Sequence, residues 1–451
     1  MAEYVIFSSS KRLFDRYFSF WILICCLPLL FLPKINLFSI AERESAGVRI
    51  DDLILLVLSV VLFWGHFILQ KRLCEIERWV FILTGFSLFS YALNHLMLTF
   101  HLLHVHASIF YCLRLLEYFM FFYVGALSFQ FVKLSTIIKA LFLWNLGLML
   151  LQRTELIGQF SILGYLPTAS DRVTGITSFP SEAGLLLSML FCFLIYDEEA
   201  SLSRLCVLPA FLKIFIQKTY VYWLFLICVT LVIFTGSRIA ILALIVAFCF
   251  RIIEDLKKAS LSSWIIAFIF TSAAVAVIAI AIMHTDSVFL RSAQLLSFRN
   301  FELVEKVWDH IDLSQDPIGR ENVRNVNYDT SWWIRIHKWC YALKIYYTHP
   351  ESYLSGIGPG FAMAALDGGF LRILTEYGVI GCCLFWKIFS SIYHISKQLK
   401  WMILVFLINM VFFDAYLAYK PMSLLFFAAG SSYTLACFST LRCSCPKRPN
   451  S

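Results

Sequence analysis

Runs of about 18 or more mostly apolar residues recur along most of the chain, and this feature limits the fold more than any other. A run of that length can cross the apolar part of a bilayer as a single helix. Hydrophobic residues make up 60% of the 451 residues and charged residues only 15%, against roughly 25% charged in soluble proteins. This composition excludes a soluble multidomain enzyme, a disordered protein and a coiled coil. Membrane enzymes, transporters and channels all remain open.

We therefore expect an all-α polytopic membrane protein with about 12 transmembrane helices. The apolar runs predict helices over residues 17–33, 51–69, 79–98, 109–131, 136–151, 181–196, 220–235, 238–253, 264–283, 369–393, 401–419 and 421–438. No clear small-residue cleavage site accompanies the first run, so we expect it to remain as an uncleaved helix. The chain then divides into helices over 1–283, one long loop over 284–368, and helices with a short tail over 369–451.

The distribution of Lys and Arg predicts the orientation in the membrane. There are 37 Lys and Arg residues against 29 Asp and Glu residues, and cytoplasmic loops of membrane proteins collect such an excess. We therefore expect no nucleic-acid partner. The loops richest in Lys and Arg share one side with both termini, so that side is predicted to be cytoplasmic. The long loop is then extracytoplasmic, and a reporter fused after Gly319 should be active outside the cytoplasm.

The long loop is expected to carry structure, because structureless loops of this length are uncommon. Within residues 331–347, one helical stripe holds Trp332, Ile336, Trp339, Leu343 and Tyr346. This spacing predicts an amphipathic helix that lies on the outer membrane surface or caps the bundle. Residues 301–311 predict a shorter helix of the same kind. Arg335 borders the stripe and is a candidate to point inward.

Three alternating glycines, Gly356, Gly358 and Gly360, follow that helix in HPESYLSGIGPGF. Glycine lets a backbone approach a ligand closely. The segment is no P-loop, because no Lys-Ser/Thr pair follows, and it does not follow a strand. Two interpretations stay open: a plain turn into the next helix, or a cradle for lipid diphosphate oxygens.

Several charged residues lie inside predicted spans, where charge is costly unless it is paired or wetted. Arg114 and Glu117 are three residues apart and share a helix face, and Arg372 and Glu376 are one turn apart. Each pair is either a structural ion pair or a contact to substrate. Asp414 is either functional or hydrogen-bonded to a neighbouring helix.

Arginines also gather in the short loops on the predicted outer side. Residues 220–253 number 34, whereas two complete spans need roughly 40, so we expect this hairpin to hold Arg238 at the floor of an outward cavity. The alternative is an anchor in the lipid headgroups. Arg172 lies in the loop that enters a helix at Pro180, and Glu182 is either a cap of that helix or a site residue. Bidentate arginine suits phosphate, so lipid diphosphate is the ligand that fits best.

The same segments resemble the O-antigen polymerase/ligase superfamily. FTGSRIAILAL is similar to its Thr-x-Ser-Arg element, and SWWIRIHKWCYALKIYYTHPESYLSGIGPGF to its Arg, Trp, His-Pro and Gly-x-Gly stretch. VRIDDLILL, LRLLEY and RVTGITSFPSE follow the family order, and the next helix matches at Leu371, Leu374, Glu376, Gly378 and Gly381. Ligases of this superfamily carry a His-Asn pair where this chain has Asp367-Gly368, so the resemblance favours a polymerase of the Wzy type.

The resemblance implies a GT-C-like helical bundle in the bacterial inner membrane that acts at the outer face. It implies a glycosyltransferase whose substrates are undecaprenyl-diphosphate-linked oligosaccharides. We expect a single displacement that inverts the anomeric centre. The sequence shows no convincing external metal cluster, so we expect no metal requirement and no cofactor. We expect Arg238 and Arg335 to stabilise the diphosphate leaving group, with Arg172 as a further contact. The candidate general bases are Asp367, His349 and Glu182, in that order. A chain-length regulator and a flippase are the expected protein partners.

Two other functions stay open. The first is an O-antigen ligase that transfers polymer to lipid A core, which the missing His-Asn pair disfavours. The second is a lipid-linked oligosaccharide flippase or another transporter. A transporter would also place cations in a wet cavity, but paired broken helices in two symmetric halves, the mark of many transporters, are not evident in the sequence.

Overall fold

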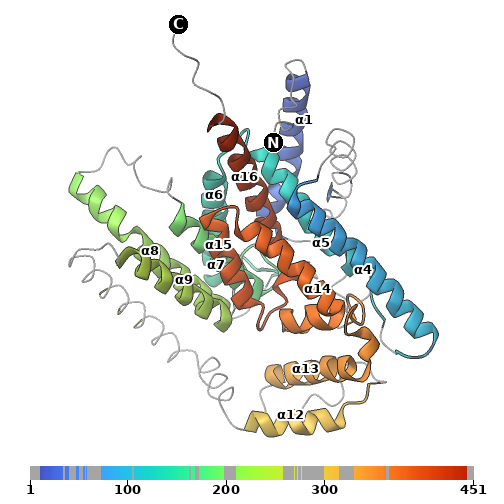
Figure 1. The fold of residues 1–451 in the computed structure, drawn as a ribbon. Helices are drawn as coiled ribbons and strands as arrows, with labels where there is room; N and C mark the ends of the chain where they lie inside the picture. The colour runs from blue at the N-terminus through green and yellow to red at the C-terminus, as the bar shows by residue number, and fades with distance from the viewer. Residues whose placement is uncertain are drawn as a thin grey trace.

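The computed structural model describes residues 11–33, 36–39, 47–49, 54–55, 57, 73–103, 106–161, 164–167, 172–197, 210–256, 269, 272, 276, 299–313, 330–361 and 365–443. Figure 1 shows that these residues are mostly helical. The helices are α1 (Lys11–Cys26), α2 (Pro28–Phe31), α4 (Glu75–Thr99), α5 (Ile109–Ser128), α6 (Leu134–Arg153), α7 (Pro180–Tyr196), α8 (Ala210–Thr235), α9 (Arg238–Leu256), α12 (Arg299–His310), α13 (Thr330–Thr348), α14 (Gly369–Tyr393), α15 (Lys397–Asn409) and α16 (Tyr419–Cys443).

Short elements complete the described fold. The 3-10 turns are η2 (Pro350–Ser352) and η3 (Ala415–Leu417). Two small antiparallel hairpins pair β1 (Asn36–Ser39) with β2 (Gly47–Arg49), and β3 (Gln159–Ser161) with β4 (Gly164–Leu166).

Four of the described helices, α4, α5, α6 and α14, are long and apolar enough to cross a membrane. Three shorter apolar helical segments accompany them, over Ser19–Phe31, Pro180–Tyr196 and Thr219–Thr235. The predicted helical fold is confirmed, and so is the presence of helices that could cross a membrane. The count of about 12 spans stays a prediction. The predicted spans over 51–69 and 264–283 lie almost wholly outside the described residues, as does Gly319.

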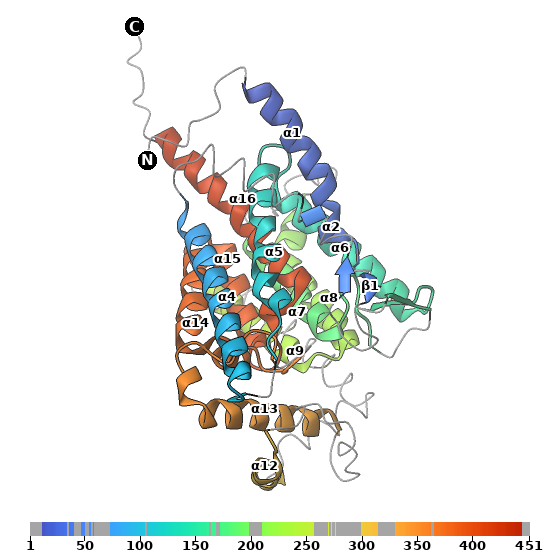
Figure 2. The same ribbon diagram turned by 90° about the vertical axis from the view of Figure 1, so that its right-hand side faces the viewer.

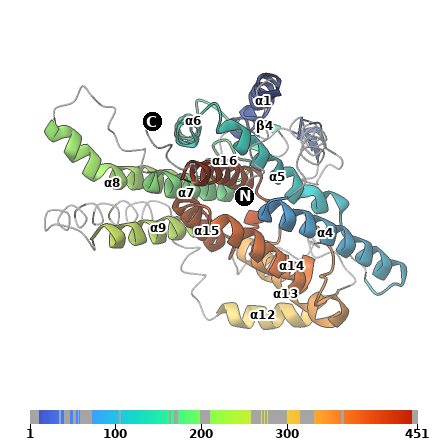
Figure 3. The same cartoon turned by 45° about the horizontal axis from the view of Figure 1, so that its top comes forward.

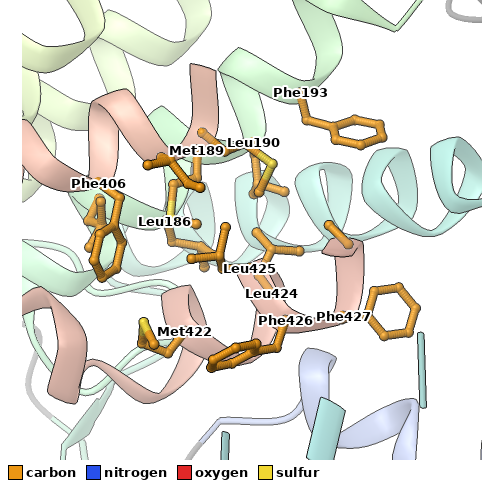
Figure 4. Packing of buried hydrophobic residues seen from close by; sticks show 14 of the residues in the cluster. Leu186, Met189, Leu190, Phe193, Phe406, Met422, Leu424, Leu425, Phe426 and Phe427 are labelled. Atoms are coloured by element: carbon orange, nitrogen blue, oxygen red, sulfur yellow. The ribbon is translucent and has the colours of Figure 1, made fainter. Parts of the chain in front are cut away.

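Helix α7 forms the centre of the bundle. Figure 3 shows it among α8, α15 and α16, and it contacts all three. It is buried from Glu182 to Tyr196 without interruption, as expected of a helix that is hydrophobic all round. In Figure 4, Leu186 and Met189 of α7 lie close to Phe406 of α15 and Leu425 of α16. This core holds the helices on which the charged residues lie.

Helices α5 and α16 pack at very short range because each carries a glycine at the contact. A Cβ on Gly125 would lie 2.0 Å from the carbonyl oxygen of Phe427, and one on Gly430 would lie 1.9 Å from that of Phe122. Small residues at helix crossings allow such close approach in membrane proteins.

Helix α14 is broken in its middle, at Gly378, which has φ 64°. The loop after η2 lies against this break and satisfies the backbone groups that the break exposes. Four hydrogen bonds of 2.8 to 3.2 Å join the two segments: Ile357 N to Thr375 O, Gly358 N to Glu376 O, Val379 N to Tyr353 O, and Ile380 N to Leu354 O. The predicted span over 369–393 has the observed bounds of α14, but the break was not predicted.

Helices α12 and α13 lie across one end of the bundle (Figures 1 and 2). Their bounds agree closely with the helices predicted over 301–311 and 331–347. They share a separate apolar cluster that includes Leu303, Ile336, Tyr341 and Ile345. Of the predicted stripe, Ile336 is buried and Leu343 is 41% exposed, and the side chain of Trp332 lies outside the described residues. The face buried in the protein also includes Tyr341 and Ile345. Contact of the exposed part of the stripe with a membrane surface stays a prediction.

The beginning of α1 and the end of α16 both lie at the end of the bundle opposite α13 (Figure 2). The two ends of the chain, residues 1–10 and 444–451, lie outside the described residues, so their common side stays a prediction. Which side faces the cytoplasm stays a prediction from the Lys and Arg distribution. The predicted span over 401–419 is wrong at its end: α15 stops at Asn409, and a turn containing Asp414 and η3 leads into α16.

Candidate functional site

An ion pair between Arg335 and Asp367 joins α13 to the segment that precedes α14. The Nε atom of Arg335 donates to Oδ2 of Asp367 at 3.0 Å. The two side chains are 29% and 31% exposed, so a ligand can reach both. The sequence marked these residues separately, one for phosphate binding and one as a base. The structure brings them into direct contact.

The backbone around Asp367 is held by the carboxylate of Asp414. The amides of Leu366, Asp367 and Gly368 donate to it at 2.7, 3.4 and 3.1 Å respectively. Asp367 has φ 59°, in the left-handed region that is unfavourable for a residue with a Cβ atom. Three consecutive amides around one anion resemble the backbone nests that bind anions in other proteins. Here the anion belongs to the protein itself.

Helix α13 holds the same segment from its carbonyl side. The indole Nε1 of Trp339 donates to the carbonyl of Leu366 at 3.1 Å, and the ammonium of Lys338 donates to the carbonyl of Ala365. Burial lowers the pKa of Lys338 below the usual lysine value, and the attraction of Asp367 and Asp414 offsets part of that shift. The segment before α14 is therefore fixed on both sides.

Beneath the ion pair lies a buried charge network centred on Arg372. Its Nε atom donates to Oε1 of Glu376 and its Nη1 atom to Oδ2 of Asp414, both at 2.8 Å. The Tyr416 hydroxyl donates to Oε2 of Glu376 at 2.8 Å, and the guanidinium lies 5.3 Å from the ring centre of Tyr111. The expected Arg372–Glu376 pair is present. Arg372 is 0% exposed, so we correct its assignment from a direct substrate contact to an internal role.

The three loop glycines, Gly356, Gly358 and Gly360, use their amides within the protein. They donate to the Ser352 carbonyl at 2.7 Å, the Glu376 carbonyl at 3.1 Å, and Oε1 of Glu376 at 3.0 Å. All three have positive φ values of 76°, 119° and 81°, which glycine adopts without strain. The loop is thus built to pack against the broken α14, in agreement with the turn interpretation. The diphosphate cradle is not supported by this geometry.

His349 lies apart from the Arg335–Asp367 pair. It follows the last residue of α13, fourteen positions after Arg335, and a helix rises about 1.5 Å per residue, so the two backbones are about 20 Å apart. Its Nδ1 atom is 3.0 Å from Oε1 of Glu351. His349 and Arg335 therefore do not converge on one reacting atom in this arrangement.

A second group of arginines lies at the turn between α8 and α9. The Nε atom of Arg172 donates to the carbonyl of Thr235 at 2.8 Å. Thr235 is the last residue of α8, so the positive charge of Arg172 stabilises the negative end of the helix dipole. Arg153 lies 5.2 Å from the ring centre of Phe234, and Arg238 is the half-buried first residue of α9. Figures 1 and 2 place this turn toward the end of the bundle that α13 covers.

The remaining candidates lie inside the helical bundle. Glu182 is buried, and its Oε1 atom accepts from the Lys420 amide at 3.0 Å. It thus caps the first turn of α16, and no side-chain cap of its own helix α7 is found among the described residues. Arg114 lies 5.4 Å from the ring centre of Tyr111, and Glu117 interacts with it electrostatically. The structure joins Arg114 to Arg372 through the ring of Tyr111, and it does not bring Glu182 to either.

Comparison with protein-family models and with characterised proteins gives no match for this chain. Within the residues that the structure describes, no group of three or more His, Cys, Asp and Glu side chains is placed to hold a metal ion.

Sequence reasoning missed two contributors to the site and the main contact of a third. Asp414 was recognised as an intramembrane acid, but its contact with the segment before α14, more than forty residues away, was not foreseen. Lys338 and Tyr416 were not singled out at all. The signal for Asp414 was the high free-energy cost of a charge inside an apolar run. This cost predicts that Asp414 has a partner, but it does not identify the partner.

Proposed function

We propose that the protein is a glycosyltransferase that polymerises lipid-linked oligosaccharide repeat units at the outer face of the bacterial inner membrane. The observation that carries the proposal is the Arg335–Asp367 pair, which places an accessible cation and an accessible carboxylate together. The pair lies between the crosswise α13 and the start of the apolar α14. A membrane-bound lipid diphosphate and a water-soluble glycan meet at such a boundary.

The chemistry needs both members of the pair. The bond between the anomeric carbon of the growing glycan and the diphosphate oxygen breaks, and a bond forms to a hydroxyl of the incoming repeat unit. The hydroxyl proton passes to Asp367, and the bond electrons leave with undecaprenyl diphosphate. Arg335 stabilises the negative charge that develops on that leaving group. A single displacement inverts the anomeric centre.

Among the described residues, the ion pair occupies Nε of Arg335 and Oδ2 of Asp367. This leaves the two terminal nitrogens of the guanidinium for phosphate and the second carboxylate oxygen for the acceptor hydroxyl. The arginines at the α8–α9 turn, Arg172 and Arg238, supply further positive charge toward the same end of the bundle. They would attract a doubly charged diphosphate.

The proposal predicts that Arg335→Ala and Asp367→Asn each lower polymer formation at least about 100-fold, the usual cost of removing one stabilising group. Arg238→Ala should have a similar effect. Arg335→Lys should rescue poorly, because a lysine cannot reproduce two-point binding of phosphate. The measurement is the ladder of glycan chain lengths on gels of cell extracts, with protein levels checked by immunoblot.

A matched control removes an ion pair of similar exposure elsewhere. Arg251 and Glu254 lie 4.0 Å apart near the far end of α9 and are 25% and 36% exposed. Arg251→Ala and Glu254→Gln should leave the ladder unchanged. Long chains of normal abundance from both Arg335→Ala and Asp367→Asn would contradict the proposal.

The deletion phenotype separates the alternatives. Loss of a polymerase leaves lipid A core carrying a single repeat unit. Loss of a flippase leaves lipid A core without any unit, and loss of a ligase leaves polymer on its lipid carrier. A strain lacking this protein is expected to show the single-repeat product.

A further inference from the structure

Asp414 occupies an unusual position relative to the proposed site. It is only 5% exposed and does not touch Arg335. Its carboxylate instead accepts the amides of Leu366, Asp367 and Gly368. It therefore contacts the backbone that carries the Asp367 side chain and is positioned to control where that side chain points.

Asp367 needs such support because its backbone conformation is costly. A residue with a Cβ atom is held at φ 59° only when the surrounding structure compensates. The three amide contacts supply this compensation. Because hydrogen bonds to a charged acceptor are stronger than neutral ones, the carboxylate form of Asp414 is well suited to the task.

Asp414 is itself fixed in place by its neighbours. Nη1 of Arg372 donates to its Oδ2 atom at 2.8 Å, and Nε of Arg372 is bound by Glu376 at the same distance. Glu376 in turn accepts from Tyr416 and from the amide of Gly360. The buried network thus connects the broken helix α14, the glycine loop and the turn before α16 to one surface residue, Asp367.

We propose that Asp414 is a positioning residue that sets the orientation of Asp367 toward Arg335 and the acceptor hydroxyl. Arg372 acts one step further back, by holding Asp414. This inference rests on the proposed function, since it assigns Asp414 to the step that Asp367 carries out. Asp414 itself touches neither substrate.

The test uses purified full-length protein with lipid-linked repeat units and measures kcat and KM separately. Asp414→Asn keeps the shape of the side chain but removes its charge and one accepting oxygen. We expect kcat to fall by about 10- to 100-fold with KM changed less than about 3-fold, because misplacing a reacting group costs rate more than binding. Asp414→Glu keeps the charge that Arg372 needs but moves the accepting oxygens, and it should also lower kcat.

A matched control is available in another buried carboxylate that caps a helix. Glu77 accepts from the Cys74 amide and from the Tyr123 hydroxyl at 2.9 Å, at the start of α4. Glu77→Gln should leave kcat within about 2-fold of wild type in folded protein. A double-mutant cycle adds a readout that a purely structural role would not give: in an Asp367→Asn background, Asp414→Asn should cause less than about 2-fold further loss.

Each outcome decides the inference. Wild-type kcat in folded Asp414→Asn or Asp414→Glu would overturn it, and so would multiplicative losses in the double mutant. If both Asp414 variants fail to fold, Asp414 is required for folding, and the positioning role is rejected. If wild-type protein transfers no glycan, the proposed function fails instead, and this result is distinct from all the others.

Discussion

Lys338 links the proposed site to the pH dependence of stability. Burial lowers its pKa in the folded protein, so the unfolded chain binds this proton more tightly than the folded one. The contribution of this group to the free energy of unfolding therefore increases as the pH rises from the lowered pKa to the usual value of about 10.4. The destabilising effect of the buried charge is fully present below the folded-state pKa and is lost at alkaline pH.

Lys338→Met removes that effect while retaining the aliphatic part of the side chain. We predict that the difference in Tm, variant minus wild type, is largest near pH 7 and becomes smaller toward pH 10.5. The measurement is thermal unfolding of both proteins in the same detergent across this range. A Tm difference that is constant with pH, or that grows with pH, would contradict the lowered pKa of Lys338.

At the scale of single residues, the sequence revealed chemical types but not contacts. Arg335 was selected because it borders the apolar stripe of a predicted helix, and Asp367 because the resemblance places it where ligases of the superfamily carry a His-Asn pair. Their pairing was not predicted, since a contact across 32 positions depends on how α13 crosses the start of α14. Arg372 was misassigned for a related reason: its depth inside the protein depends on helices far away in the chain.

At the scale of elements, Gly378 allows α14 to break and the glycine loop to lie against the break. A Cβ there would lie 2.5 Å from the carbonyl carbon of Leu354 and 2.7 Å from the amide nitrogen of Gly356, and φ 64° is unfavourable for alanine. We predict that Gly378→Ala destabilises the protein by about 2 kcal/mol or more. The measurement is a lower Tm than that of wild type.

Gly85→Ala provides the control for that substitution. Gly85 lies inside α4, and a Cβ at this position would meet no atom within 4 Å. Alanine favours a helix interior over glycine by about 1 kcal/mol, so Gly85→Ala should leave Tm unchanged or raise it. Equal Tm values for the Gly378 and Gly85 variants would show that the break in α14 is not required.

The elements themselves were predicted well where an apolar run coincides with one helix. The bounds of α14 matched at both ends, and α7 matched within one residue, because continuous apolar runs identify buried helices. The end of α15 was missed by ten residues, since the run continues through Val411 to Phe413 while the backbone turns there. That turn is stabilised by Asp414 and its distant amide partners, which a local pattern does not contain.

At the scale of the whole molecule, the charges that mark the proposed site gather toward one end of the bundle. Arg335 and Asp367 lie where α13 crosses the start of α14, and the α8–α9 turn points toward the same end (Figures 1 and 2). The beginning of α1 and the end of α16 lie at the other end. Composition alone indicated a membrane protein. The common location of these charges could not be predicted from the sequence, because it depends on how all the helices pack.

The proposed polymerase activity can be measured as glycan transfer by the purified protein in liposomes supplied with undecaprenyl-diphosphate-linked repeat units. Mass spectrometry should detect lipid-linked dimers and longer chains, with one undecaprenyl diphosphate released for each new linkage. The rate should be unchanged in excess EDTA, since we expect no metal requirement. Movement of the lipid-linked units across the bilayer with no new glycosidic linkage would contradict the proposed polymerase activity and would identify a transporter instead.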